Sequence, residues 1–244
     1  MNTKHLLICA AISLAATSTV NAQDWSGQGE AGLIKASGNT DSENFNVGLN
    51  FKKEGEIISH DINFALYKAS ADDVDSAESI AASYTLKYGL TDRSYLFGAL
   101  SYLDDDFDGF TEQASAALGY GYKVIDTEPV GWELGIGAGY RDTSELIKLE
   151  TGEEFEGADL SGATLVLLSD YRNQLTANTQ FLDKFVAEIG SDNTFIENDA
   201  ALVVSMNEKF ALKAGVLVRH NTDPAPGSDE TDTITTINLL YNFN

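Results

Sequence analysis

Apolar and polar residues alternate with a period of two along most of the chain, most clearly between residues 113 and 141. The apolar positions in this stretch end in aromatic residues, and they are Ala114, Ala116, Leu118, Tyr120 and Tyr122, then Trp132, Leu134, Ile136, Ala138 and Tyr140. A period of two places such a set on one face of a β-strand. Bulky aliphatic residues would dominate the core face of a soluble sandwich, whereas aromatic residues near strand ends are typical of a transmembrane β-barrel.

The same alternation predicts about twelve strands, each long enough to cross a bilayer at a tilt. We expect them at residues 25–36, 43–53, 57–68, 78–89, 94–104, 113–123, 132–141, 158–171, 175–189, 194–206, 209–220 and 231–244. Residues 94–104 are apolar on both faces, so the pattern does not assign their inward side. We expect residues 69–77 and 144–157 to form polar, acidic loops.

The lengths of the connections support a barrel. Short connections at residues 54–56, 90–93, 126–129, 172–174 and 207–208 alternate with mostly longer and more acidic ones. An even number of strands places both termini of a bacterial barrel, together with its short turns, on the periplasmic side. The sequence therefore predicts an all-β fold, a transmembrane antiparallel up-and-down β-barrel with its longer loops outside the cell.

The first residues have the features of a secretory signal peptide. Lys4 and His5 precede an apolar run at residues 6–16, and Ala22 ends a segment suited to cleavage. We therefore expect a signal peptide at residues 1–22 and the barrel at residues 23–244. The one cysteine, Cys9, lies in the predicted signal, so the mature chain would have neither a disulfide nor a cysteine-based zinc site.

The charge of the chain bears on its partners. A formal net charge of −23 disfavours nucleic acid, whose binding needs a basic surface. We expect solvated acidic loops, with outer-membrane lipid and lipopolysaccharide as surroundings. The acidic field would repel anionic lipopolysaccharide unless divalent cations bridge the two. The last strand closes with Tyr241 and Phe243 before Asn244, which fits the signal read by the barrel-insertion machinery. The sequence leaves the oligomeric state open.

Several short segments carry a family resemblance that extends over essentially all of the mature chain. They are Trp-Ser-Gly at residues 25–27, Ser-Gly-Asn-Thr at 37–40, Ser-Tyr-Leu-Phe-Gly at 94–98, Gly-Tyr-Gly-Tyr at 119–122, Gly-Tyr-Arg at 139–141, Gly-Ser-Asp-Asn-Thr at 190–194 and Arg-His-Asn-Thr at 219–222. In this order they resemble the YdiY-like family of salt-induced outer-membrane proteins, also called domain of unknown function 481. The resemblance implies a Gram-negative outer-membrane barrel linked to salt or osmotic conditions. It implies no reaction, ligand or site residue.

The sharpest local motif lies at residues 104–109. Asp104, Asp106 and Asp108, followed by Gly109, match the first half of a calcium loop, which needs oxygen ligands at alternate positions and a glycine for its turn. Ser115 stands where such a loop needs a bidentate acid. A solvated acidic loop is therefore the alternative to a calcium site, and no other cofactor is expected.

An enzymatic barrel would need a nucleophile and a base. Known barrel hydrolases pair a histidine with a serine or an acid on the outer side, and the mature chain would offer only His60 and His220. His220 lies at the outer end of its strand, but no serine stands two residues on. We therefore expect no enzymatic activity, with a lipid or peptide hydrolase based on His220 as one alternative and a cation binder based on the acidic loops as another.

The inward face of the predicted barrel carries both signs of charge. The expected lumen-lining residues are Lys87, Lys123, Glu133, Arg141, Lys213 and Arg219. A barrel of this size lies between a filled core and an open pore, so the pattern does not decide whether the lumen is open or plugged. Inward glycines at residues 119, 121, 135, 137 and 139 are expected to widen it. The sequence thus predicts a structural barrel or a narrow channel.

Overall fold

The computed structural model describes residues 25–36, 42–71, 74–105, 110–148, 154–224 and 229–243, and the predicted signal peptide lies outside these ranges. These residues form thirteen β-strands. The strands are β1 (Ser26–Ala36), β2 (Ser42–Lys53), β3 (Ile58–Ala71), β4 (Val74–Gly89), β5 (Ser94–Asp105), β6 (Phe110–Asp126), β7 (Val130–Lys148), β8 (Glu154–Asp159), β9 (Gly162–Gln174), β10 (Thr179–Ile189), β11 (Thr194–Ser205), β12 (Phe210–Asn221) and β13 (Thr231–Phe243). Within the same residues, no helix is long and apolar enough to cross a membrane.

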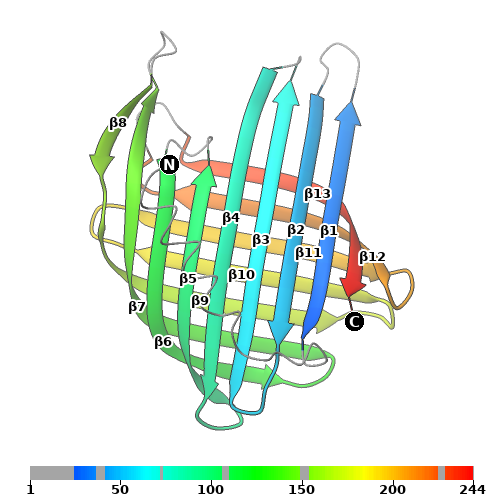
Figure 1. The fold of residues 1–244 in the computed structure, drawn as a ribbon. Coiled ribbons are helices and arrows are strands. Elements are labelled where there is room, and N and C mark those ends of the chain that lie inside the picture. Colours follow the sequence, from blue (N-terminus) through cyan, green and yellow to red (C-terminus); the bar gives the residue numbers. More distant parts are fainter. Residues whose placement is uncertain are drawn as a thin grey trace.

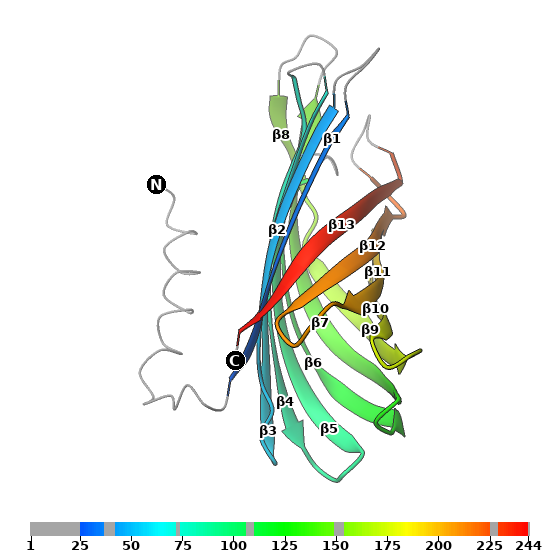
Figure 2. The same ribbon diagram turned by 90° about the vertical axis from the view of Figure 1, so that its right-hand side faces the viewer.

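All pairings between the strands are antiparallel, and they close a ring. Consecutive strands pair from β1 to β7. β7 then pairs with β9, consecutive strands pair from β9 to β13, and β13 pairs with β1. Of the thirteen described strands, β8 alone lies outside the ring, where it pairs with the far end of β7, so twelve strands form the barrel. Figure 1 shows β1 to β5 crossing in front of β9 to β12, and Figure 2 shows the barrel from the side. The predicted fold class is confirmed.

The two ends of the barrel carry different sets of connections. The short-turn rim carries the connections at residues 54–57, 90–93, 127–129, 175–178 and 206–209, and both ends of the described chain. We name the opposite end, where β8 also lies, the long-connection rim, although residues 72 and 73 alone separate β3 from β4 there. The short turns are closed by their own backbone: the amide nitrogens of Leu90 and Thr91 both donate to the carbonyl of Ser94, at 2.8 and 3.1 Å.

The structure corrects two of the predicted loops. β3 and β4 continue their pairing beyond Ala69, with Ala71 opposite Val74, so strand occupies most of the predicted loop at residues 69–77. Likewise β7 runs on to Lys148 and pairs with β8 inside the predicted loop at residues 144–157. Backbone hydrogen bonds make these ladders, so polar and acidic side chains did not prevent them.

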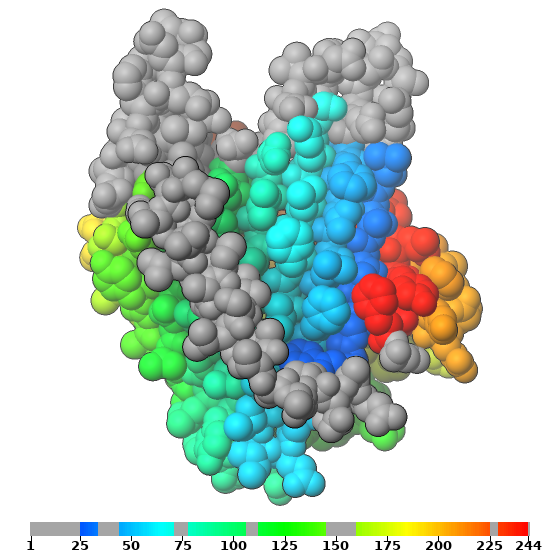
Figure 3. Space-filling view, viewed as in Figure 1, coloured from blue at the N-terminus to red at the C-terminus, as the bar shows by residue number. Residues whose placement is uncertain are grey.

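Large apolar side chains face outward around the ring. On β12, Ala211 is 3% exposed while its neighbour Leu212 is 45% exposed, and the alternation continues along the strand. Leu118 on β6 reaches 74% exposure. Figure 3 shows the outer wall over β1 to β4. The alternation of exposure also shows which face of β5 points inward, because Tyr95 and Phe97 are buried. These residues and the alternate positions after them face the lumen.

Aromatic side chains cover the seam between β1 and β13, where the barrel closes. Gly27 and Gly29 of β1 face outward, and the ring of Phe243 on β13 lies against both, 3.0 and 3.1 Å from where a Cβ atom would stand. Phe51 on β2 stacks near Phe243, with 6.4 Å between ring centroids, and Tyr241 meets Phe243 edge-on at 5.2 Å. The terminal aromatic residues therefore pack across the first strand.

Candidate functional site: the barrel lumen

Side chains from strands that are not neighbours can meet only across the interior of a closed ring. Contacts of this kind therefore identify which residues occupy the lumen. They gather near the long-connection rim, where we define a cross-lumen layer by its members, Ser79, Asp105, Gln113, Ser115, Arg141, Glu188, Glu197 and Arg219.

Arg219 bridges opposite walls of the barrel. Its guanidinium on β12 donates to the carboxylate of Asp105 on β5, and the two paths around the ring between these strands are equally long. The Arg219 and Asp105 side chains are only 6% and 4% exposed. Glu197 on the adjacent β11 accepts a second hydrogen bond from Arg219 at 2.9 Å. A buried arginine between two carboxylates has its charge compensated, which burial requires.

A second arginine extends the layer from the neighbouring wall. Arg141 on β7 donates to Glu188 on β10 at 3.3 Å and also to Gln113, and its guanidinium lies 4.1 Å from the ring centroid of Phe195. The other oxygen of Glu188 accepts from Ser115 on β6 at 2.7 Å. These contacts join β6, β7, β10 and β11 through the interior, so side chains occupy the lumen at this level.

The inward glycines Gly119 and Gly121 of β6 do not widen the lumen, which corrects the prediction for these two positions. A Cβ atom on Gly121 would lie 2.2 Å from the ring of Tyr95, and one on Gly119 would lie 2.4 Å from the ring of Phe97. Both rings come from β5, and Phe97 packs in a buried cluster with Val166 of β9. The glycines therefore provide the space that inward aromatic rings fill.

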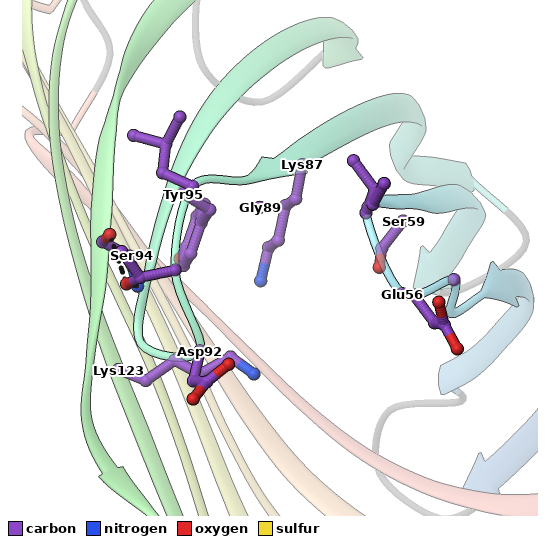
Figure 4. Close-up of a pocket in the computed structure, with 12 residues that line it drawn as sticks. Glu56, Ser59, Lys87, Gly89, Asp92, Ser94, Tyr95 and Lys123 are labelled. Carbon is purple, nitrogen blue, oxygen red and sulfur yellow. Dashed lines mark hydrogen bonds between the residues drawn. The ribbon is translucent and has the colours of Figure 1, made fainter.

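A cavity lies at the short-turn rim (Figure 4). The cavity has a volume of about 340 Å³ and lies between the turn before β3 and the turn before β5. Lys87 extends into it, while its ammonium group donates to Glu133 across the interior at 2.6 Å. Glu133 also accepts from the Tyr95 hydroxyl at 2.8 Å, and Lys87 lies 4.9 Å from the Tyr95 ring centroid.

The remaining predicted lumen residues lie at other levels. Lys213 on β12 lies 3.3 Å from Glu30 on β1 and 3.8 Å from Asp199 on β11. Lys123 lines the cavity at the short-turn rim, and its ammonium group lies 3.5 Å from Asp126. The structure therefore distributes the predicted lumen residues over several depths, and each basic residue among them lies next to an acid.

The sequence profile of a family described as "Protein of unknown function, DUF481" matches residues 29–243. The chain belongs to this family. It is 29% identical to "Uncharacterized protein YdiY" of Escherichia coli strain K12, over 87% of this chain and 81% of that protein.

Among solved structures, this DUF481 chain is similar to the translocator domain of the autotransporter NalP from Neisseria meningitidis. The TM-score is 0.49 at 11% identity, with 99% of this chain and 95% of that chain covered. The COG4313 outer membrane channel from Pseudomonas putida F1 has a TM-score of 0.47 at 9% identity, with 89% and 93% covered. Likenesses at this level say nothing about what the DUF481 chain does.

The other predicted sites of the DUF481 chain fare differently. Asp106 and Asp108 of the predicted calcium loop lie outside the described residues, while Asp104 is half-buried at the end of β5. Within the described part of the chain, no group of three or more His, Cys, Asp or Glu side chains could hold a metal ion. Nδ1 of His60 lies 2.9 Å from the Tyr84 hydroxyl, and Nδ1 of His220 lies 2.8 Å from the Thr231 hydroxyl.

Sequence reasoning missed several members of the cross-lumen layer. Asp105 was placed in the acidic loop, although the alternation of β5 continued one step beyond Leu103 puts its side chain inward. Ser79 and Gln113, both 4% exposed, are uncharged and gave no signal beyond their inward register. The partners of these residues lie on distant strands, so only the closed ring reveals them.

Proposed function

We propose that this protein is an outer-membrane barrel that forms a narrow conduit for small polar solutes, closed at its long-connection end by the cross-lumen layer. The Arg219–Asp105 bridge carries the proposal, because it joins opposite walls and is almost completely buried. We propose no enzymatic role.

The outer surface supports a place in the membrane. Leucine, isoleucine, valine and aromatic side chains are exposed around the ring, with Leu118 at 74% and Ile237 at 59%. Such a surface would be a liability in water and is favourable against lipid. In a Gram-negative outer membrane the short-turn rim would face the periplasm, and the cavity at that rim would open to the periplasm.

The interior supports a conduit over a filled core. Lys184 faces inward between Leu182 and Val186, yet it is exposed. Ser101 of β5 also faces inward and is exposed, with its hydroxyl 2.7 Å from that of Ser115. Lys184 and the cavity therefore provide water-accessible space on the periplasmic side of the cross-lumen layer, and Ser101 is exposed at the layer itself.

Osmotic swelling of proteoliposomes tests the conduit. The parent is compared with an Asp105→Asn, Arg219→Gln double variant, which removes both charges of the bridge while keeping similar side-chain sizes. We expect neutral sugars to enter faster through the double variant than through the parent. The matched control is Lys68→Gln, Glu78→Gln, which removes an ion pair whose side chains are 44% and 46% exposed. If neither protein admits solute while both are folded, the barrel is structural.

The surroundings follow from the same placement. We propose contact with lipopolysaccharide at the long-connection rim, insertion by the barrel-insertion machinery through the terminal strand, and a role under changing salt or osmotic conditions. The packing of Phe243 on Gly27 and Gly29 supports a part for the last strand in closure. Growth of a deletion strain across a range of salt concentrations would test the envelope role, and equal growth of parent and deletion at all of them would contradict it.

A further inference from the structure

The outer wall over β9, β10 and β11 departs from the apolar pattern of the ring. Glu188 on β10 and Glu197 on β11 point into the lumen, so Asp183 and Asn198, at positions of the opposite parity, face outward. Asn198 donates to the Asp183 carboxylate at 3.0 Å. An acidic side chain and an amide therefore lie on the surface that the proposed function turns toward lipid.

Further polar groups surround this pair. Tyr171 lies opposite Asp183 in the β9–β10 ladder and accepts a hydrogen bond from Asn173 at 3.1 Å. Ser169 lies opposite Phe185 and accepts from the Trp132 indole at 3.1 Å. We define the outer polar patch by these residues, which are Ser169, Tyr171, Asn173, Asp183 and Asn198.

The outer polar patch is bordered by apolar residues along its strands. On β10, Phe181 and Phe185 flank Asp183, and Leu202 on β11 and Val216 on β12 are each 40% exposed. The carboxylate of Asp183 therefore lies inside the apolar surface and not beyond its edge. An ionisable side chain facing hydrocarbon is costly, and a single neutral amide does not compensate a carboxylate.

We propose that the outer polar patch is the interface between two copies of this chain in the membrane. The patch is self-complementary, because it carries both the hydroxyl donor of Tyr171 and the carboxylate acceptor of Asp183, which lie opposite each other in the β9–β10 ladder. The Asn198 amide already donates to Asp183 and to the Lys184 carbonyl of its own chain, so under a two-fold axis the Tyr171 hydroxyl of each copy donates to Asp183 of the other, as isologous contacts require. A lipid headgroup lies at the membrane–water boundary, so it would have to move into the apolar part of the membrane to supply the same hydrogen bonds.

The mature chain allows a clean cross-linking test, since its one cysteine lies in the predicted signal peptide. Ala200 lies opposite Asp183 in the β10–β11 ladder, at the centre of the outer polar patch. Ala82 lies on the outer face of β4, on the other wall, and is half-buried like Ala200. The experiment oxidises Ala200→Cys and the matched control Ala82→Cys in isolated membranes, then separates the products without reductant.

We expect a disulfide-linked dimer from Ala200→Cys and little or none from Ala82→Cys. Adding Asp183→Leu to Ala200→Cys should reduce the dimer at least several-fold, while a heat-dependent gel shift shows that the chain remains folded. Equal cross-linking of the two cysteine variants would overturn the interface, as would an unchanged dimer after Asp183→Leu. The proposal rests on the membrane placement above, which fails separately if the folded parent extracts without detergent.

Discussion

The Arg219 bridge predicts an asymmetry between two substitutions that a simple ion pair would not give. Arg219 donates to Asp105, whose side chain is 4% exposed, and to Glu197 at 2.9 Å. Arg219→Gln leaves two carboxylates facing an interior from which the guanidinium has gone, and we expect it to cost about 3–5 kcal/mol. Asp105→Asn keeps the Arg219–Glu197 pair and an amide oxygen that still accepts, so we expect a cost of about 1–2 kcal/mol.

Urea-induced unfolding in lipid vesicles, followed by tryptophan fluorescence, measures these costs. The double variant closes a thermodynamic cycle, and its cost should fall short of the sum of the single costs by about 0.5–3 kcal/mol. Lys68→Gln is the control, because its partner Glu78 is 46% exposed and such pairs contribute at most about 1 kcal/mol. Equal costs for the two single substitutions, or strict additivity in the cycle, would refute the account of a compensated buried arginine.

Three further outcomes follow from individual contacts. Gly119→Ala should destabilise the barrel by about 1–3 kcal/mol in the same unfolding assay, because its Cβ atom would overlap an inward ring, whereas Gly162→Ala, which meets nothing within 4 Å, should change little. Phe243→Ala should lower stability by about 0.5–1.5 kcal/mol more than Phe45→Ala, since the two rings are 41% and 42% exposed but the first also packs on the seam; equal losses would argue against the seam contact. His220→Gln should leave any lipid or peptide cleavage by the purified protein unchanged, and a loss of cleavage would revive the hydrolase alternative.

Periodicity predicted the ring because a strand with one apolar face has one inward register. The inward positions of Arg141, Lys213 and Arg219 follow directly from that rule. Asp105 was assigned to a loop because its neighbours are acidic, although the alternation of inward and outward positions continues through it. β8 could not be predicted, because its ladder depends on backbone hydrogen bonds and not on an alternation of side chains.

Contacts across the lumen are a different kind of information. The pairing of Arg219 with Asp105, and of Arg141 with Glu188, depends on which walls face each other and at which height. Strand order, tilt and stagger determine those distances together, and no single segment of sequence carries them. Gly119 and Gly121 were misjudged for the same reason, since the rings that fill their space come from another strand.

The most direct test of the closed lumen is single-channel conductance of the refolded barrel in a planar bilayer, at low and high salt. We expect few or no steps from the parent and discrete, larger steps from the Asp105→Asn, Arg219→Gln double variant. High salt should not open the parent, because buried pairs are screened much less than exposed ones. Large, stable steps from the parent, equal to those of the double variant, would contradict a lumen closed by the Arg219–Asp105 bridge.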